Sequence, residues 1–324
     1  MLVSVVIPAY NAEAFIEAAV RSALEQTYSP VEVIVVNDGS TDGTQALVEG
    51  IVDERIRLLS QPNSGVNSAR NQGIKAARGA FIALLDADDV WDPEKLTRQV
   101  GALQQRPEWV AVGAFMHHMA LDGRVLGVSG HPIGQAELRE IRAAILNPFP
   151  ISSLLVRREA LEEAGLFDEQ LDRDVPGGVG DLDLLSRIAD VGDLGCIEQV
   201  LGGYRVHSGS LSAEFFLSQR QGVRYLAARK GAGVVGRTLT LEDFRAAERW
   251  SFSRWRRDLS AYSYRAAGVA AAEGATVRAV CWALPALVLW PTRTVRRLAL
   301  QRGRRSQYAL PSRPQGSGAH QAPH

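Results

Sequence analysis

The first ninety residues alternate between short β-branched runs and segments with helical spacing of apolar residues, and this alternation limits the possible folds most strongly. Residues 2–7 (LVSVVI) and 31–37 (VEVIVVN) are continuous apolar runs, which is typical of strands buried on both faces of a parallel sheet. Residues 11–27 between them have helical spacing, with Asn11 placed to cap the helix. A third strand, a Gly-rich helix start and a fourth strand follow. The pattern predicts βαβ units in a doubly wound α/β sheet.

Composition excludes several classes of protein. The chain has 324 residues with 46% hydrophobic and 22% charged residues, which indicates a globular protein of about two domains. Its two cysteines, Cys196 and Cys281, are too few for a disulfide scaffold or a zinc module and are typical of a reducing compartment. The 36 basic residues equal the 36 acidic ones, which argues against a nucleic-acid partner.

Polar residues follow three of the predicted strands, where doubly wound sheets bind ligands. The most informative loop is LLDADD, because a D-x-D triplet after a buried strand offers two hard oxygen ligands to Mg²⁺ or Mn²⁺. An acidic loop that precedes a helix beginning near Asp92 explains the same residues equally well. The triplet by itself therefore leaves both interpretations open.

Five motifs together resolve this ambiguity. They are SVVIPAYN, VNDGSTDGT, NSGVNSARNQGIKAARGAFIALLDADD, GLFDE and YRVHSGSLS, in the order and spacing seen in family 2 glycosyltransferases. Residues 1–212 thus resemble that family, whose GT-A type fold is a doubly wound mixed sheet flanked by helices. The resemblance implies a nucleoside-diphosphate sugar as donor, a divalent metal (Mn²⁺ or Mg²⁺) and an inverting single displacement.

The resemblance also assigns donor-binding residues. Asp38 of NDGS resembles the carboxylate that reads a uracil-type base, which favours a UDP- or dTDP-sugar, and Asp86 resembles the ribose-side member of the D-x-D. A carboxylate that accepts from a ring N–H gives base preference because an unpaired buried polar group is costly. The base and ribose pocket would be shaped by Pro8, Tyr10 and Asn11.

The remaining assignments concern the diphosphate. Asp88 resembles the metal ligand, Ala87 lies between it and Asp86, and His207 of YRVHSGS resembles a residue near the metal. Arg70 would lie near the diphosphate, where a guanidinium matches phosphate geometry. The alternative for Arg70 is an ion pair on a helix surface, and for His207 a structural histidine.

The resemblance places the general base at Asp181, in GDLDLL. Family members usually have Glu-Asp here, whereas this chain has Gly180 before the aspartate, so the groups that support the base differ. Asp183 would lie on a different helix face and is interpreted as an ordinary carboxylate of a helix N-terminus. Two glycine runs are interpreted as loops: Gly231–Gly236 (GAGVVG), and GGVG at 177–180 as a mobile loop over the site.

We predict three regions: residues 1–211 as the nucleotide-sugar-binding catalytic domain, 212–302 as a helical C-terminal extension and 303–324 as a disordered tail. No acidic residue follows Glu273, whereas eight arginines do. The apolar stretch 279–291 is too short to span a bilayer. Two interpretations stay open: an interfacial helix with a basic flank, or a helix that packs on the catalytic domain or a dimer partner.

We therefore predict an inverting glycosyltransferase that adds one sugar to an acceptor hydroxyl in cell-envelope or exopolysaccharide assembly. The acceptor would be a glycan or a lipid-linked glycan. Because no signal peptide precedes the first strand, the expected location is cytoplasmic, with peripheral contact to the inner face of the membrane as an option. The competing hypotheses are a non-catalytic nucleotide-sugar-binding protein, favoured by Gly180, and, ranked last, a nucleotidyltransferase.

Overall fold

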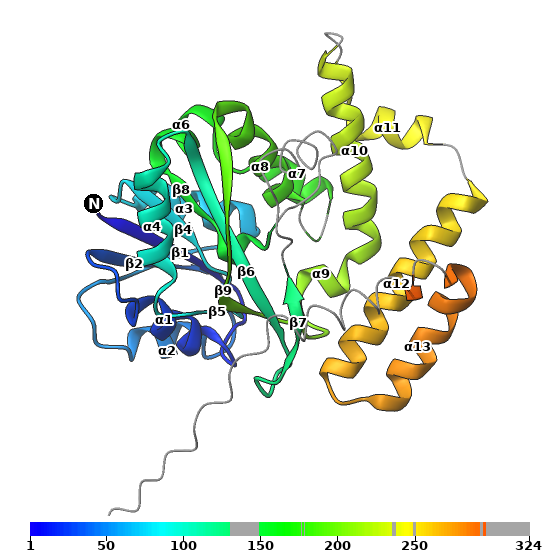
Figure 1. Cartoon of the computed structure of the whole chain (residues 1–324), viewed down its shortest axis with the longest axis horizontal. Helices are drawn as coiled ribbons and strands as arrows, with labels where there is room; N and C mark the ends of the chain where they lie inside the picture. Colours follow the sequence, from blue (N-terminus) through cyan, green and yellow to red (C-terminus); the bar gives the residue numbers. More distant parts are fainter. Residues whose placement is uncertain are drawn as a thin grey trace, which may run out of the picture.

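The computed structural model describes residues 1–129, 149–175, 177, 179–234, 238–248, 251–291 and 294–295. It has an α/β part built on a single mixed sheet and a group of helices beside it (Figure 1). This arrangement agrees with the predicted α/β class and with a helical extension after the last strand. The basic residues from 296 onward and the predicted tail 303–324 lie outside the described residues.

The sheet begins with four parallel strands, as the alternating pattern predicts. They are β1 (Val3–Ala9), β2 (Val31–Asp38), β3 (Ile56–Gln61) and β4 (Phe81–Leu84). The others are β5 (Val90–Trp91), β6 (Trp109–Met119), β7 (Val125–Ser129), β8 (Leu155–Arg157) and β9 (Asp193–Arg205). The strand order is β3-β2-β1-β4-β8-β6-β9-β5, with β7 paired to β6. Antiparallel pairing of β8 with both β4 and β6 makes the sheet mixed.

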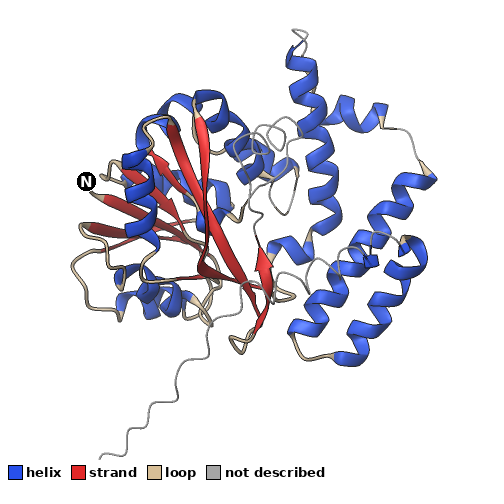
Figure 2. Cartoon of the chain, in the orientation of Figure 1, coloured by secondary structure: helices blue, strands red, loops and turns tan. Residues whose placement is uncertain are grey.

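Helices cover both faces of the sheet, which explains why its first strands are apolar throughout (Figure 2). One face packs on α1 (Ile16–Leu24), α2 (Thr44–Glu49) and α4 (Lys95–Gln105). The other packs on α3 (Val66–Ala76), α6 (Arg158–Ala164) and α8 (Gly180–Val191). Alternate residues of β1 show this division: Val5 joins the first core and Val6 the second. A short helix, α7 (Glu169–Asp174), precedes α8.

Within the described part of the chain, five helices follow β9. They are α9 (Leu211–Glu214), α10 (Phe216–Val234), α11 (Leu241–Ala247), α12 (Phe252–Ala272) and α13 (Thr276–Leu289). A third apolar core joins α10 and α11 to the segment that leads into α8, through Leu171, Val179, Leu182, Tyr225 and Leu241 among others. Among the described residues, no helix combines the length and the apolar character needed to cross a membrane.

Two local predictions are wrong. Asn11 does not cap α1, which begins at Ile16; Asn11 has φ 47°, and its side chain bonds the next loop instead. Gly231 and Gly233 belong to α10 rather than to a loop, while Gly236 lies outside the described residues. Outside the helix itself, no atom of the described residues lies within 4 Å of a Cβ built at Gly231 or Gly233, so no close approach of another described segment requires glycine there. The helical pattern before them simply continues, at a cost of about 1 kcal/mol per glycine relative to alanine.

Candidate active site

The loops after β1 and β2 are joined at one edge of the sheet. The Asn11 backbone N–H donates to Ser40 Oγ at 3.0 Å, and the Thr41 N–H donates to Asn11 Oδ1 at 2.8 Å. Asparagine tolerates the left-handed backbone that this turn requires. Beside the turn, Pro8 is buried within β1, whereas the Tyr10 ring is 52% exposed just beyond the strand. The predicted pocket residues thus lie together, with Tyr10 available to a ligand.

Asp38 ends β2 and is almost fully buried. Its Oδ1 accepts hydrogen bonds from Gln61 Nε2 at 2.7 Å and from the Ser64 N–H at 2.8 Å, and its Oδ2 accepts from the Gly65 N–H at 3.0 Å. A carboxylate offers about four acceptor positions, so these three bonds leave one position on Oδ2. Asp38 therefore orders the loop after β3 and keeps capacity for one further N–H donor.

Arg70 lies on α3 and is buried, so it does not form the helix-surface ion pair that was its alternative interpretation. Its Nη2 lies 2.7 Å from Asp86 Oδ1, and its guanidinium lies over the Phe167 ring, 5.2 Å from the centroid. Burial alone would lower the pKa of Arg70, but the carboxylates of Asp86, Asp181 and Asp172 outweigh burial and raise it. Arg70 thus stays charged at the centre of an acidic cluster.

The D-x-D loop is anchored to β9. Asp88 Oδ2 lies 3.0 Å from His207 Nε2, and the Asp88 carbonyl accepts from Arg205 Nε at 2.8 Å. Ala87 is buried between the two aspartates. Asp89 is fully buried, and its Oδ1 accepts from the Arg205 N–H at 2.9 Å. Burial and the charges of Asp88 and Asp86 hold the pKa of Asp89 well above its usual range. Asp89 thus fixes the D-x-D loop to the end of β9. This role was not identified from the sequence.

Asp88 and His207 could hold a divalent cation. Carboxylate oxygen and imidazole nitrogen are both ligands for such ions. The described residues contain no group of three or more His, Cys, Asp or Glu side chains placed to bind a metal. Mg²⁺ is commonly held through one or two carboxylates with substrate phosphates and water completing its shell. The pair therefore fits a cation that is bound together with a diphosphate.

Asp181 is the second residue of α8 and is half-buried by surface area. Its Oδ1 accepts from the Leu182 N–H at 2.8 Å. Burial raises the pKa of Asp181, the charge of Asp86 raises it further, and the charge of Arg70 opposes both. The net shift is upward, which makes this carboxylate a stronger base than an ordinary aspartate. The structure thus brings Asp181 into the electrostatic environment of Arg70 and Asp86.

Gly180 has no room for a side chain. A Cβ built there would lie 2.3 Å from Asn67 Nδ2 and 2.7 Å from Asn67 Oδ1. Asn67 is fully buried and donates from Nδ2 to the Asp168 carbonyl at 3.0 Å. The amide of Asn67 therefore occupies the space into which a side chain at position 180 would extend. Gly180, which replaces the usual glutamate, thus makes room for Asn67, a residue that the sequence analysis did not identify.

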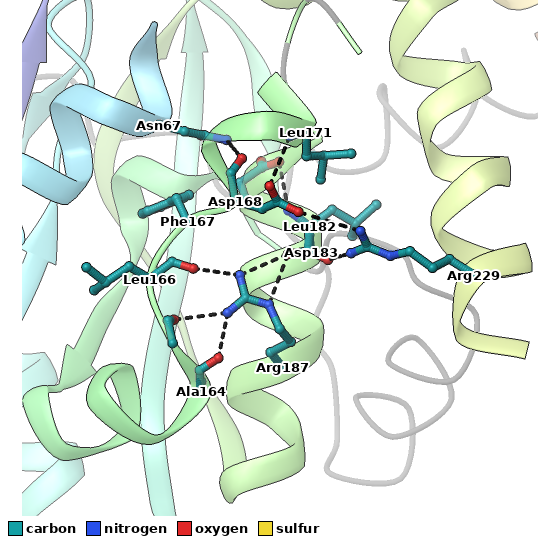
Figure 3. A network of polar contacts seen from close by, with 12 residues as sticks. Asn67, Ala164, Leu166, Phe167, Asp168, Leu171, Leu182, Asp183, Arg187 and Arg229 are labelled. Atoms are coloured by element: carbon teal, nitrogen blue, oxygen red, sulfur yellow. Dashed lines mark hydrogen bonds and ion pairs between the residues drawn. The ribbon is translucent and has the colours of Figure 1, made fainter. Parts of the chain in front are cut away.

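The Asp183 carboxylate is buried and takes part in a network that joins α8, α10 and the GLFDE segment (Figure 3). It is therefore not an ordinary carboxylate of a helix N-terminus. It accepts from Arg187 Nε at 3.0 Å, one turn along α8, and pairs with Arg229 of α10. Arg229 also lies 3.6 Å from Asp168 of GLFDE, which caps α7. Spacing within α8 could have indicated Arg187. Nothing local indicates Arg229, because it lies 46 residues away.

Comparison with known proteins agrees with this architecture. The chain matches Glycosyl transferase family 2 over residues 4–165. An uncharacterised glycosyltransferase of Nostoc sp. is 30% identical over 257 residues, 75% of this chain and 76% of the relative. The succinoglycan biosynthesis protein ExoO of Rhizobium meliloti is 36% identical over 221 residues, 65% of this chain and 62% of ExoO.

Solved structures show the same fold at lower identity. A mannosyltransferase of Pyrobaculum calidifontis has a TM-score of 0.52 and 22% identity, over 94% of this chain and 82% of that one. TarS of S. aureus (residues 1–349) has a TM-score of 0.51 and 17% identity, over 87% of this chain and 89% of that one. With a GT-A type sheet, five family motifs and these relatives, the chain belongs to glycosyltransferase family 2.

Proposed function

We propose that the protein transfers one sugar from a nucleoside-diphosphate sugar to an acceptor hydroxyl with inversion at the anomeric carbon. One observation carries this proposal, the cluster of charges around Asp181. In it, Asp88 Oδ2 lies 3.0 Å from His207 Nε2, and Arg70 Nη2 lies 2.7 Å from Asp86 Oδ1. This cluster combines a metal-binding pair, a buried cation and a carboxylate of raised basicity. Such groups suit the loss of a diphosphate and the deprotonation of an alcohol.

In this mechanism Asp181 accepts the proton of the acceptor hydroxyl as the oxygen attacks the anomeric carbon. Arg70 limits how far the pKa of Asp181 rises, which favours the ionised carboxylate that accepts the proton. Asp88 and His207 would hold a divalent cation. When bound, that cation would supply positive charge to the departing nucleoside diphosphate. Holding the two substrates in line contributes further to the rate.

For the donor we favour a UDP- or dTDP-sugar. The acceptor position on Asp38 Oδ2 that no donor among the described residues fills suits the ring N–H of a uracil-type base. The exposed Tyr10 follows β1, the strand that pairs with β2. The solved structures of similar fold include TarS in complex with UDP or UDP-GlcNAc and the mannosyltransferase in complex with GDP-Man. These complexes support a nucleotide-sugar donor as a class and do not choose among bases.

For the acceptor we propose a glycan of the cell envelope or an exopolysaccharide, free or lipid-linked. ExoO is named for succinoglycan biosynthesis. The glucosyltransferase WfgD of Escherichia coli, 44% identical over 103 residues, is named for transfer to a sugar on diphosphoundecaprenol. A non-catalytic sugar-nucleotide sensor is a weaker candidate. The Asn67 side chain explains why residue 180 is glycine, and the proposed base, Asp181, is still present.

The test is release of nucleoside diphosphate from a panel of UDP-, dTDP- and GDP-sugars with Mn²⁺ or Mg²⁺, with and without EDTA. We expect one donor to be used, and the reaction to stop with EDTA and in Asp88→Asn. Donor binding without turnover, with a range of acceptor glycans present, would instead support a sensor. Absence of binding to every donor would contradict the proposal.

We also propose that α13 contacts the inner face of the membrane. Its outward side carries Val277, Val280, Leu284 and Val288, each more than half exposed and spaced by three or four residues. Its inward side contacts α12, where the Ser260 hydroxyl donates to the buried Ala286 carbonyl at 3.2 Å. The sequence that follows α13 is rich in arginine and free of acidic residues, which suits anionic lipids.

A further inference from the structure

A cavity of about 190 Å³ lies between α10, α12 and α13, outside the cluster that holds the proposed base. Its lining includes Phe216, Tyr262, Trp282, Arg265, Glu273 and Arg278. Sites for drug-sized ligands span about 300 to 1,000 Å³, so this cavity suits a smaller group, such as a phosphate or diphosphate, rather than a nucleotide.

The cavity adjoins the proposed diphosphate end of the donor site. Ser208 lines it and directly follows His207, the partner of Asp88. The Ser208 N–H donates to Glu273 Oε1 at 2.9 Å, so α12 holds the loop that carries His207. A group bound in the cavity would therefore lie next to the segment that contacts the donor.

Arg265 provides a positive charge that no carboxylate neutralises within the described part of the chain. Its guanidinium donates to the Ser212 hydroxyl and lies 5.9 Å from the centre of the Phe216 ring. Its buried Nε has no hydrogen-bond partner there. Arg265 lines this aromatic-walled cavity, and a guanidinium in such a place is well suited to a phosphate oxygen.

Glu273 does not cancel this charge. Its Oε1 accepts from Ser208, and its Oε2 lies 3.6 Å from Arg278 Nη2. Glu273 and Arg278 thus offset each other, and the cavity keeps one net positive charge from Arg265. The aromatic side chains add an apolar wall: the Tyr262 and Trp282 rings meet edge to face with centroids 5.4 Å apart.

We propose that this cavity binds the phosphate-bearing end of the acceptor, with Arg265 as the principal ligand and Arg278 at the rim. The proposal rests on the proposed transfer and names the acceptor class as a phosphorylated glycan carrier. Trp282 lines the cavity from α13, the helix with the exposed apolar side, so an apolar chain attached to the phosphate can continue along that helix.

The test uses calorimetric titration of the full chain with farnesyl diphosphate, farnesol and inorganic diphosphate, in EDTA and in an Asp88→Asn background. These conditions remove metal-dependent binding at the donor site. We expect farnesyl diphosphate to bind, with affinity at least tenfold lower in Arg265→Met and several-fold lower in Arg278→Ala. Arg256→Ala, an exposed arginine of α12 that lies over Trp290, is the matched control and should bind as the parent does.

Arg265→Lys keeps the charge and should retain most of the binding, which separates loss of a ligand from loss of folding. If inorganic diphosphate binds as tightly as farnesyl diphosphate, the site recognises phosphate alone; if farnesyl diphosphate binds more tightly, the site recognises a lipid diphosphate. Equal binding of farnesol, or unchanged binding in Arg265→Met, would overturn the proposal. Because the assay contains no sugar donor, its failure is separate from a failure of transfer.

Discussion

At the scale of single residues, Gly180 and Asn67 share one space. The amide of Asn67 lies where a Cβ at position 180 would be, and Nδ2 is held by the Asp168 carbonyl. Its Oδ1 is buried without a hydrogen-bond donor among the described residues. A larger residue at 180 must displace this amide, so the two positions should tolerate substitution only together.

Gly180→Glu alone should lower the free energy of unfolding by about 1–3 kcal/mol, because a side chain is forced into an occupied space. Gly180→Glu combined with Asn67→Gly should recover part of that loss. Gly101→Glu is the control, because Gly101 lies in α4 and, outside that helix, no atom of the described residues lies within 4 Å of a Cβ built there. Urea denaturation measures the stability of the three variants. Equal stability of Gly180→Glu and of Gly180→Glu/Asn67→Gly would refute the hypothesis that residues 67 and 180 compete for the same space.

Asp181→Asn keeps the shape of the side chain and removes its basicity. We expect kcat to fall about 100- to 10,000-fold, the usual contribution of a general base, with donor affinity unchanged. Asp190→Asn, at an exposed position of the same helix, should leave both quantities unchanged. Turnover assays with donor titration measure them, and an Asp181→Asn enzyme with near-parental kcat would rule out this base.

The pH dependence of kcat/KM should report the same carboxylate. A base acts when deprotonated, so activity should be lost as pH falls through the pKa of Asp181, which burial and Asp86 raise above the usual 3.8. Because the charge of Arg70 lowers this pKa, Arg70→Met should move the acid limb to higher pH. A pH–rate profile in buffers of constant ionic strength tests the direction. An acid limb that moves down, or not at all, contradicts the assignment.

At the scale of secondary-structure elements, α10 is joined to α8, the helix of the proposed base, by charge as well as by apolar packing. Arg229 pairs with the buried Asp183 and lies near Asp168, and Lys230 Nζ donates to Ser186 at 3.0 Å. Leu182 packs in the same core as Tyr225 and Leu226 of α10. The first long helix of the C-terminal group therefore supports the position of α8.

Arg229→Met should lower the free energy of unfolding by about 1–3 kcal/mol, because Asp183 stays buried with Arg187 as its remaining partner. The loss should be smaller in Arg229→Lys. Arg245→Ala removes an exposed arginine of α11 whose side chain, among the described residues, bonds the Asp174 backbone carbonyl, and it should change stability little. Chemical denaturation monitored by circular dichroism compares the three, and equal stability of Arg229→Met and the parent would exclude this junction.

At the scale of the whole molecule, the exposed apolar side of α13 lies on the helical group rather than on the sheet. We expect the protein to sediment with vesicles rich in phosphatidylglycerol and the variant Val280→Asp/Leu284→Asp/Val288→Asp to remain largely in solution. Removing apolar contact and adding negative charge both oppose binding to an anionic surface.

The matched control is Val52→Asp/Val125→Asp, which changes two exposed valines away from α13. It should sediment as the parent does. If the parent is a dimer by light scattering and the triple variant a monomer, with equal sedimentation of both on vesicles, this side of α13 is an interface between two copies and the membrane proposal fails.

Much of the α/β part follows from the sequence by itself. The first two strands are β-branched runs, and each of the first three strands is followed by a helical pattern. This periodicity is local, so it predicts parallel pairing without knowledge of contacts. The motifs likewise placed Asp38, Asp86 and Asp88 at strand ends, because residues that directly follow a parallel strand reach the same edge of the sheet.

Only the tertiary structure decided which distant residues meet. Asn67 fills the space beside Gly180, and Arg229 reaches Asp183. Arg265 bonds Ser212 near the His207 loop and has no carboxylate partner among the described residues. These partners are separated by tens to more than a hundred residues, and helical or strand periodicity carries no information at that range. Arg229, for instance, looks in the sequence like any solvated helix charge; packing of α10 against α8 is what gives it a buried carboxylate to neutralise.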